Sequence, residues 1–375
     1  MQRTIYIESY ECMTGVSKNS EELWSSLSAG RSGVAPQSME RWAPRSREYF
    51  ESYKSTPIAS LIKDDLKGSA LDTLVTRLLQ VFKKACFIKA PDCPVGIIYS
   101  STKGAIEDHL SLEGPIVDSL DIVLNEFLEK AALENIVISQ SVSNACASSH
   151  GALALGKKWI EAGLCERVHI ISGDIVGPFI QTGFKSLKAL SAESCRPFQK
   201  ERDGLILGEA ICALTLSSFK SDFELADVVI FNEAHAVTSP SPEGTGLYTC
   251  ASEVVKKGAP DMAIAHGTAT YTNDLIEDEV LSKIQELVKK DFPITAAKWA
   301  TGHTLGSSGL VDLIAAINCL KHNKIFPIPN AHDQESFKGK NYVYNLALDL
   351  PLSSVLVTSL GFGGVNGALL VRRAQ

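Results

Sequence analysis

The sequence lacks any apolar run long enough to cross a bilayer, which takes about 20 residues as a helix. The apolar stretch NLALDLPLSSVLVTSLGFGG (345–364) is interrupted by Asp349, by Pro351 and by its glycines. The first residues, MQRTIYIESYECM, also lack the continuous apolar core of a secretory signal peptide. We therefore expect a cytoplasmic protein that does not insert into membranes.

Paired cysteines and a basic block are missing as well. The nine cysteines are an odd number, and none of them forms a C-x-x-C pair. This pattern is typical of reduced intracellular thiols and argues against a disulfide scaffold or a metal site. The formal net charge is −7 at pH 7, with no run of lysine or arginine to offset it. A nucleic-acid partner is therefore not expected.

The composition that is present is that of a large globular protein. Of the 375 residues, 45% are hydrophobic and 21% are charged, which is enough for two domains or for one fold made of two similar halves. Strand-like runs at 3–9, 95–101, 135–142 and 167–174 alternate with helical ones. This rhythm predicts an α/β fold whose sheets are largely buried.

Two pairs of segments within the chain resemble each other. A glycine-rich turn leads into an apolar strand both at 204–218 and at 358–373. Similarly, a strand, a chemically interesting residue, a helix and a second strand follow one another around Cys146 and around His303. This repetition predicts a duplicated architecture with a junction near 220–226 and one site where the halves meet.

Cys146 stands where the strand-like run NIVISQSVS gives way to helical spacing. A cysteine at a helix N-terminus feels the positive end of the helix dipole and unpaired N–H groups, which favour the nucleophilic thiolate. Its neighbours are small enough to let another molecule approach; they are Ala145, Ala147, Ser148 and Ser149. By composition alone, a cysteine packed in the core is the common alternative.

Two histidines follow in segments rich in glycine and threonine. AIAHGTATYTNDLIEDEV (263–280) contains His266 in a tight polar loop, and KWATGHTLGSSGLVDLIAA (298–316) contains His303 before a buried helix. A lone histidine after an apolar run is commonly structural. The polar residues that come directly after His266 favour a functional role instead.

A helix-opening cysteine, an H-G-T-x-T loop and a K-x-x-x-G-H-x-x-G-x-x-G segment occur in this order. Together they resemble the Cys-His-His site of the elongating β-ketoacyl-ACP synthases, or ketosynthases, of the thiolase superfamily. RPFQKERDGLILGEA (196–210) and GFGGVNGALL (361–370) resemble two more signatures of that family. The resemblance implies a thiolase-like α/β fold, in which two βαβ-rich halves, 1–222 and 223–375, form a five-layered αβαβα core.

The resemblance also implies a mechanism. Cys146 would attack an acyl thioester, and the oxyanion would lie between the backbone N–H groups of Cys146 and Phe362. His266 and His303, as neutral imidazoles, would stabilise the enolate that forms when a malonyl thioester loses CO2. No metal and no organic cofactor would be needed, because the loss of CO2 drives the condensation and acyl carrier protein holds the substrates.

Further site residues follow from the same resemblance. Lys298 and Glu277 would pair with each other and fix the positions of the two histidines. The ring of Phe362 would act as a gate over the acyl pocket. Four residues are expected to bind substrate, namely Thr268, Thr270, Gly361 and Gly363. The two threonines would contact the pantetheine arm of the carrier.

The sequence departs from the family pattern at a few positions. Gln199 stands where RPFDxxRDG has an aspartate, and Ala210 replaces a usual glycine. Ser307 and Ser308 replace a usual pair of alanines. None of these changes removes a member of the triad. They favour a specialised fatty-acid, polyketide or polyene pathway over a housekeeping role.

Four hypotheses follow from these residues. The first is a discrete type II condensing enzyme. The second is a non-condensing, chain-length-factor-like partner subunit, although such subunits characteristically lose the nucleophile that Cys146 retains. A cysteine hydrolase would need an Asn or Asp to orient one histidine. A degradative thiolase would need a second catalytic cysteine near the C-terminus, which GFGGVNGALLVRRAQ lacks.

The expected partners are an acyl carrier protein and a second subunit. The subunits would form a homodimer, or a heterodimer with a related ketosynthase or chain length factor, by joining their sheets edge to edge. Carrier proteins are acidic, so a basic patch is expected around the entrance to the site. The candidates for this patch are Lys185, Lys188 and Lys200.

Overall fold

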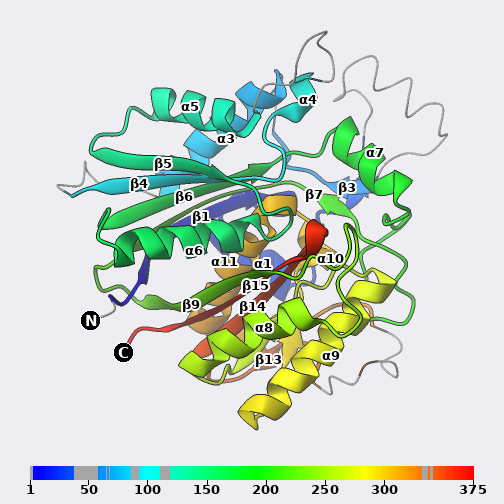
Figure 1. Ribbon diagram of the computed structural model, residues 1–375. Helices are drawn as coiled ribbons and strands as arrows, with labels where there is room; N and C mark the ends of the chain where they lie inside the picture. Colours follow the sequence, from blue (N-terminus) through cyan, green and yellow to red (C-terminus); the bar gives the residue numbers. More distant parts are fainter. Residues whose placement is uncertain are drawn as a thin grey trace.

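A computed structural model describes residues 3–37, 58–64, 66, 68–85, 93–109, 119–331, 337 and 341–375. In this part of the chain, ten strands form one sheet through the middle of the molecule (Figure 1). In spatial order they are β11 (Ile294–Thr295), β10 (Met262–Ile264), β14 (Ser354–Gly361), β15 (Val365–Arg373), β9 (Phe223–Asn232), β1 (Tyr6–Thr14), β8 (Ala210–Ser217), β6 (Arg167–Asp174), β4 (Val95–Ser100) and β5 (Ile136–Val142). The smaller sheets are β12 (Lys324–Ile325) with β13 (Leu348–Asp349), and β2 (Ala35–Pro36) with β3 (Ile58–Ser60) and β7 (Leu207–Gly208).

The large sheet consists of two sets of five strands with the same topology. Numbered along the chain within each set, the spatial order is 3-2-4-5-1 in both, namely β5-β4-β6-β8-β1 and β11-β10-β14-β15-β9. In each set, strands 2, 3 and 4 are parallel, and strand 5 runs antiparallel to strands 4 and 1. The two sets join where the start of β1 pairs with the start of β9, at Tyr6 with Glu224 and at Ile7 with Phe223. An internal duplication accounts for this repetition.

Helices fill the space between the two sets and cover both outer faces (Figure 1). In the middle, α6 (Ser148–Glu161) and α11 (Ser308–His322) each contact strands of both sets. On the outside, α3 (Ala70–Ala85) and α5 (Ser119–Ala131) pack on the first set, and α8 (Thr245–Val254) covers the second with α9 (Tyr271–Val288) against it. The predicted five-layered αβαβα arrangement is therefore confirmed.

The remaining helical segments are short or lie at the ends of the layers. They are α1 (Ser20–Ser28), α4 (Ile106–His109), α7 (Pro178–Ser186), η2 (Val255–Lys257), α10 (Lys298–Thr301), η3 (Leu305–Ser307) and η4 (Phe362–Gly364). The helix α1 packs against α11 and β1. No helix within the described ranges combines the length and the apolarity that crossing a membrane requires.

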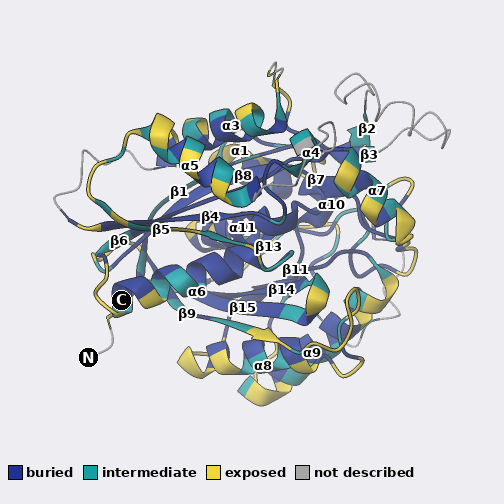
Figure 2. Ribbon diagram, turned by 45° about the horizontal axis from the view of Figure 1, so that its top comes forward, coloured by how far each residue is buried: buried dark blue, intermediate teal, exposed yellow. Residues whose placement is uncertain are grey.

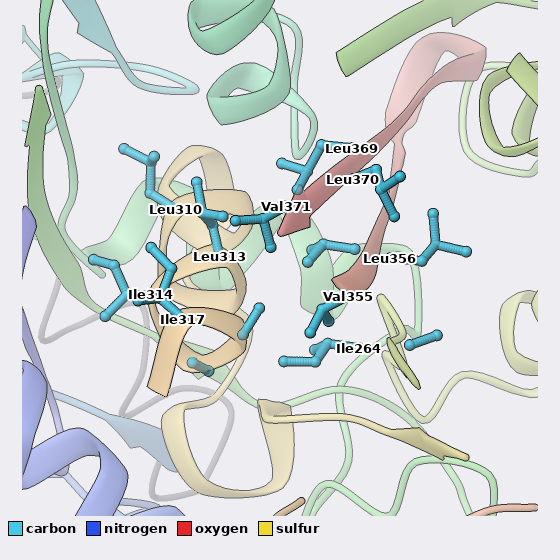
Figure 3. Packing of buried hydrophobic residues seen from close by; sticks show 14 of the residues in the cluster. Ile264, Leu310, Leu313, Ile314, Ile317, Val355, Leu356, Leu369, Leu370 and Val371 are labelled. Atoms are coloured by element: carbon cyan, nitrogen blue, oxygen red, sulfur yellow. The ribbon is translucent and has the colours of Figure 1, made fainter. Parts of the chain in front are cut away.

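The central helix α11 is buried along almost its whole length. Every residue from Ser308 to Leu320 is buried, and Figure 2 contrasts the buried α11 with the exposed outer faces of α8 and α9. Figure 3 shows its side chains Leu310, Leu313, Ile314 and Ile317 beside Val355, Leu369, Val371 and Ile264 of β14, β15 and β10, whereas Leu356 and Leu370 point to the other face of these strands. Each such side chain contributes about 1.5–3 kcal/mol by leaving water, so the N-terminus of α11 is held in a fixed place.

The strand predicted to follow the helix after His303 does not join the large sheet. The segment 324–328 contains β12, which pairs with β13 outside the large sheet. The strand that corresponds to β6 is β14, which comes about thirty residues later along the chain. The boundary predicted at 222/223 falls at the start of β9, and the division into two domains stays a prediction.

Candidate active site

Cys146 lies in the short connection between β5 and α6. The preceding residue, Ala145, has a φ of 49°, in the left-handed region that non-glycine residues rarely adopt. Ser148 stabilises this turn, because its hydroxyl donates to the carbonyl of Ala145 and accepts the N–H of Asn144. The turn directs Cys146 into a cavity, although only 5% of its surface is exposed.

His303 lies in the equivalent connection of the second half, between β11 and α11. Its backbone is fixed, because its N–H donates to Ile206 and its carbonyl accepts the N–H of Gly208. The Nε2 atom of His303 is 3.1 Å from Sγ of Cys146. Its Nδ1 atom is 3.0 Å from the hydroxyl of Ser308. The imidazole therefore bridges the nucleophile and the first turn of α11.

His266 follows β10 and faces His303. The two ring centroids are 5.2 Å apart and the ring planes are perpendicular. Glu277, on α9, fixes the backbone of this loop by accepting the N–H of His266 at 2.7 Å and that of Gly267 at 2.8 Å. The Nδ1 atom of His266 is buried and has no hydrogen-bond partner among the described residues. The three triad residues predicted from the sequence thus come together in one place.

The predicted pair of Lys298 with Glu277 is wrong. The ammonium group of Lys298 pairs with Asp312 on α11, at 3.1 Å. Glu277 instead accepts the hydroxyl of Thr358 in addition to the two backbone N–H groups. Asp312 was missed, although a single acid in the otherwise apolar run LVDLIAA was a usable signal. Spacing along the chain does not tell which of two buried acids a lysine faces.

Burial keeps both imidazoles neutral. It lowers the pKa of His303 to about 3, with a smaller effect in the same direction from the positive charge of Lys298. Burial and then Lys298 also lower the pKa of His266 far below its ordinary value. Each ring therefore carries one N–H and one lone pair at neutral pH. This is the protonation state expected from the resemblance.

Cys146 is a thiol in the free protein, and the expected thiolate is wrong. Burial raises the pKa of Cys146 to about 11 and outweighs the backbone N–H of Phe362 and the charge of Lys298, which act in the opposite direction. The backbone N–H groups of Phe362 and Cys146 both act on the sulfur in the direction that lowers its pKa. These are the two groups predicted to hold an oxyanion, so they do converge on the nucleophile.

The triad lines a cavity of about 360 Å³. Other residues around it that the sequence had singled out are Thr268, Thr270, Gly361, Phe362 and Lys188. The hydroxyls of Thr268 and Thr270 lie 3.0 Å apart. Gly363 does not line the cavity, because it turns away with a φ of 80° and donates its N–H to Val237. Its predicted contact with substrate is therefore not supported, and Gly364 takes its place.

Phe184, on α7, is a cavity residue that the sequence did not reveal. Its ring stacks on that of Phe362, with centroids 5.4 Å apart, and lies edge-on to His303 at 6.4 Å. The ring of Phe362, for which a gating role was predicted, therefore packs as one member of a stacked pair, and the gating role stays a prediction. The sequence PFIQTGFKS gave no signal for this role, since a phenylalanine at helical spacing is commonly part of the core.

Two models of protein families match the chain. The model described as the N-terminal domain of β-ketoacyl synthase matches residues 138–221, and the model of the C-terminal domain matches residues 223–332. Together they cover just over half of the chain. All three triad residues fall within the matched ranges.

No cluster of metal-binding side chains occurs in the parts of the chain that the structure covers.

The curated relatives are named as synthases of 3-oxoacyl-[acyl-carrier-protein]. A 3-oxoacyl-[acyl-carrier-protein] synthase 2 of Staphylococcus aureus is 28% identical over 256 residues, which are 62% of this chain and 60% of the relative. The enzyme of the same name from Synechocystis is 27% identical over 252 residues, with the same coverage. The chain therefore spans about 60% of the length of these relatives.

Solved structures share the fold over the whole chain. The ishigamide ketosynthase/chain length factor aligns over 100% of both chains with a TM-score of 0.86 and 20% identity. A β-ketoacyl synthase from Burkholderia phymatum aligns equally fully, with a TM-score of 0.84 and 19% identity. A ketosynthase in complex with its chain length factor, from Xenorhabdus doucetiae, covers 99% of this chain with a TM-score of 0.83 and 21% identity. The thiolase-like fold predicted from the sequence is confirmed.

Proposed function

Because the chain belongs to the β-ketoacyl synthase family, we propose that it condenses an acyl thioester with a malonyl thioester, both carried on acyl carrier protein, with loss of CO2. The single observation that carries this proposal is the 3.1 Å contact between Sγ of Cys146 and Nε2 of His303, in a cavity that His266 also lines. A nucleophile, a base beside it and a second imidazole are the groups that the two half-reactions need.

The first half-reaction is acylation of Cys146. Its thiol is protonated, so Nε2 of His303 accepts the proton while sulfur attacks the carbonyl carbon of the acyl thioester. The oxyanion forms against the N–H groups of Cys146 and Phe362; removing one such donor typically costs about 2.7–4 kcal/mol in the transition state. The carrier thiolate then leaves and takes the proton from His303.

The second half-reaction is condensation. The malonyl thioester loses CO2, and the electrons of the broken C–C bond form an enolate whose oxygen accepts hydrogen bonds from His266 and His303. The enolate carbon attacks the acyl group on Cys146, the C–S bond breaks, and the sulfur leaves as a thiolate that takes up one proton from solvent. Neutral imidazoles suit this task because each has an N–H to donate. The proposed reaction needs neither a metal nor an organic cofactor.

We assign the partners on the same basis. Lys188 lines the cavity and is the candidate for contact with an acidic carrier protein, with Lys185 and Lys200 nearby in the sequence. Thr268 and Thr270, which line the cavity, are the candidates for contact with the pantetheine arm. The strand β5 forms one end of the sheet, and its Val137 is 56% exposed. A second copy or a related subunit would pair with this edge.

The decisive experiment is mass spectrometry of the intact protein after incubation with acyl carrier proteins of different chain lengths. We expect the wild type to gain the mass of one acyl group and Cys146→Ala to gain none. Malonyl carrier protein should then yield a β-ketoacyl product with the wild type. The absence of any acylation would contradict the proposal, and a product formed only when a second ketosynthase is present would favour the chain-length-factor-like role.

A further inference from the structure

We propose that Ser308 is a positioning residue that lets His303 act first as an acceptor and then as a donor of hydrogen bonds. The inference rests on the proposed condensation, in which His303 takes a proton from Cys146 and later donates to an enolate oxygen. The hydroxyl of Ser308 lies 3.0 Å from Nδ1 of His303, on the side of the ring away from the sulfur. Ser308 is 1% exposed, so its hydroxyl is shielded from bulk solvent.

Local backbone geometry places this hydroxyl. After His303 the chain makes the 3₁₀ turn η3, in which Leu305 has a φ of 55°. The turn brings Ser308, the first residue of α11, back to the Nδ1 side of the His303 ring. The hydroxyl of Thr304 lies 3.2 Å from that of Ser308 and holds it from the other side. A short chain of two hydroxyls, one imidazole and one thiol therefore leads from the first turn of α11 to the nucleophile.

A hydroxyl is suited to both states of a neutral imidazole because it can donate and accept. With the proton on Nδ1, the ring donates to Ser308, and the lone pair of Nε2 faces the thiol of Cys146. With the proton on Nε2, Ser308 donates to Nδ1, and Nε2–H points into the cavity. A backbone N–H at this place could only donate, and it would hold His303 in the second state alone.

The neighbouring serine gives a contrast. Ser307 is also buried, but its hydroxyl contacts Ser172 at 2.9 Å and donates to the carbonyl of Ala210. It does not contact His303. His266, for its part, has no described hydrogen-bond partner at Nδ1. Of the two histidines, His303 is therefore the one equipped to change roles, and it is also the one beside the sulfur.

Removal of the hydroxyl should affect the two roles unequally. In Ser308→Ala, a proton on Nδ1 would lack an acceptor, which costs more than a lone pair without a donor. The variant therefore favours Nε2–H, which serves the enolate but not the thiol. Transfer of the thiol proton also makes the ring cationic, with an Nδ1–H whose acceptor among the described residues is Ser308. A hydrogen bond to a charged group is worth about tenfold or more in rate.

The first readout is alkylation of Cys146 by iodoacetamide, measured as the rate of mass gain on the peptide that contains Cys146. In this reaction the bond between sulfur and carbon forms, iodide leaves and the thiol proton passes to Nε2 of His303. We expect Ser308→Ala to alkylate about tenfold or more slowly than the wild type. Ser307→Ala should match the wild type, and Thr304→Val should fall by about threefold, since it loses one neutral hydrogen bond.

The second readout is the release of CO2 from malonyl carrier protein. It should change by less than alkylation does in Ser308→Ala. Ser308→Thr keeps the hydroxyl and should restore alkylation; if its extra methyl lowers the melting temperature, the comparison of Ser308→Ala with Ser307→Ala decides. Equal loss in both readouts, or equal effects of the two alanine variants, would overturn the inference.

The outcomes separate this inference from the proposed function. Alkylation needs no carrier protein, so slow alkylation of Ser308→Ala supports the role of Ser308 even in a protein that makes no condensed product. Conversely, a wild type that condenses, together with a Ser308→Ala variant that alkylates normally, overturns the inference and leaves the proposed function standing.

Discussion

The two halves of the sheet have the same topology but carry different chemistry at the same edge. The parallel strands 2, 3 and 4 of each half end at the site, as is usual for ligand sites in α/β folds. Strand 3 leads to Cys146 in the first half and to His303 in the second, and strand 2 of the second half leads to His266. The duplicated frame thus supplies one nucleophile and two imidazoles rather than two identical sites.

The ends of strand 4 show how each half supports the other. Asp174 and Gly361 occupy equivalent places, because each pairs with the first residue of strand 5. Asp174 accepts the N–H of Gly306, in the turn after His303. A side chain on Gly361 would instead meet the carbonyl of Asn144 and the N–H of Ala147, on either side of Cys146. An acid in one half and a glycine in the other therefore each fit the reactive loop of the opposite half.

The largest expected effect is a difference in the rate of acylation between variants of the two histidines. His303 contacts the sulfur and His266 does not. Because a general base contributes about 10²–10⁴-fold, we expect His303→Ala to slow acylation of Cys146 by at least about 100-fold. His266→Ala should leave acylation within a few-fold of the wild type and remove the release of CO2. Stopped-flow transfer from an acyl carrier protein and CO2 release measure the two steps, and equal losses of acylation in both variants would contradict this assignment.

The pH dependence of alkylation separates the two ways of activating Cys146. The pKa of Cys146 is raised to about 11, so little thiolate exists at neutral pH, and His303 is neutral above its lowered pKa of about 3. The alkylation rate of the wild type should therefore be nearly constant between about pH 5 and 9, with His303 as the base. In His303→Ala only thiolate reacts, so the rate should rise about tenfold per pH unit. A wild type that also rises in this way would show that His303 is not the base.

The carboxylates of the two halves should support different steps. Asp174 accepts two hydroxyls, from Ser101 and Thr102, and the backbone N–H groups of Thr102 and Gly306. An asparagine would place its NH2 group, which is a hydrogen-bond donor, opposite one of these donors, so that one hydrogen bond would be lost. We expect Asp174→Asn to lower the free energy of unfolding by about 2–3 kcal/mol, measured by urea denaturation.

The matched change in the second half is Glu277→Gln, since Glu277 accepts the N–H groups of His266 and Gly267. The cost in stability should be similar. Acylation should fall more in Asp174→Asn, because the turn after His303 moves. Release of CO2 should fall more in Glu277→Gln, because the loop of His266 moves. If both variants slowed the same step, the proposed division of labour between the halves would fail.

The sequence predicted the triad because each member stands at a strong local signal. Cys146, His266 and His303 each follow a strand-like run and precede small or glycine residues. The alternation of strands and helices predicted an α/β fold, and the five layers followed from the resemblance to the ketosynthases. Asp174 ends the apolar run RVHIISGD and could have been found in the same way. The sequence could not show which way the side chains of α11 point. The rotation of this helix decides that Asp312 pairs with Lys298 and that Ser308 faces His303.

The smallest expected effect concerns Gly361, the counterpart of Asp174. A Cβ there would lie 3.0 Å from the carbonyl oxygen of Val365 and 3.2 Å from that of Asn144, so the backbone must shift by a few tenths of an ångström. That shift moves the neighbouring N–H of Phe362 away from the sulfur. Because loss of a whole oxyanion donor costs about 10²–10³-fold, we expect Gly361→Ala to reduce kcat by about tenfold.

Gly183→Ala is the matched control for this change. Gly183 lies in α7, and a Cβ on it meets nothing within 4 Å. The substitution should leave kcat unchanged and stabilise the protein by about 0.5–1 kcal/mol, since alanine loses less entropy in a helix. Normal activity in Gly361→Ala would mean that the loop of Cys146 accommodates a methyl group at this position. Gly361 would then not be required to position the reactive loop of the opposite half, as Asp174 is.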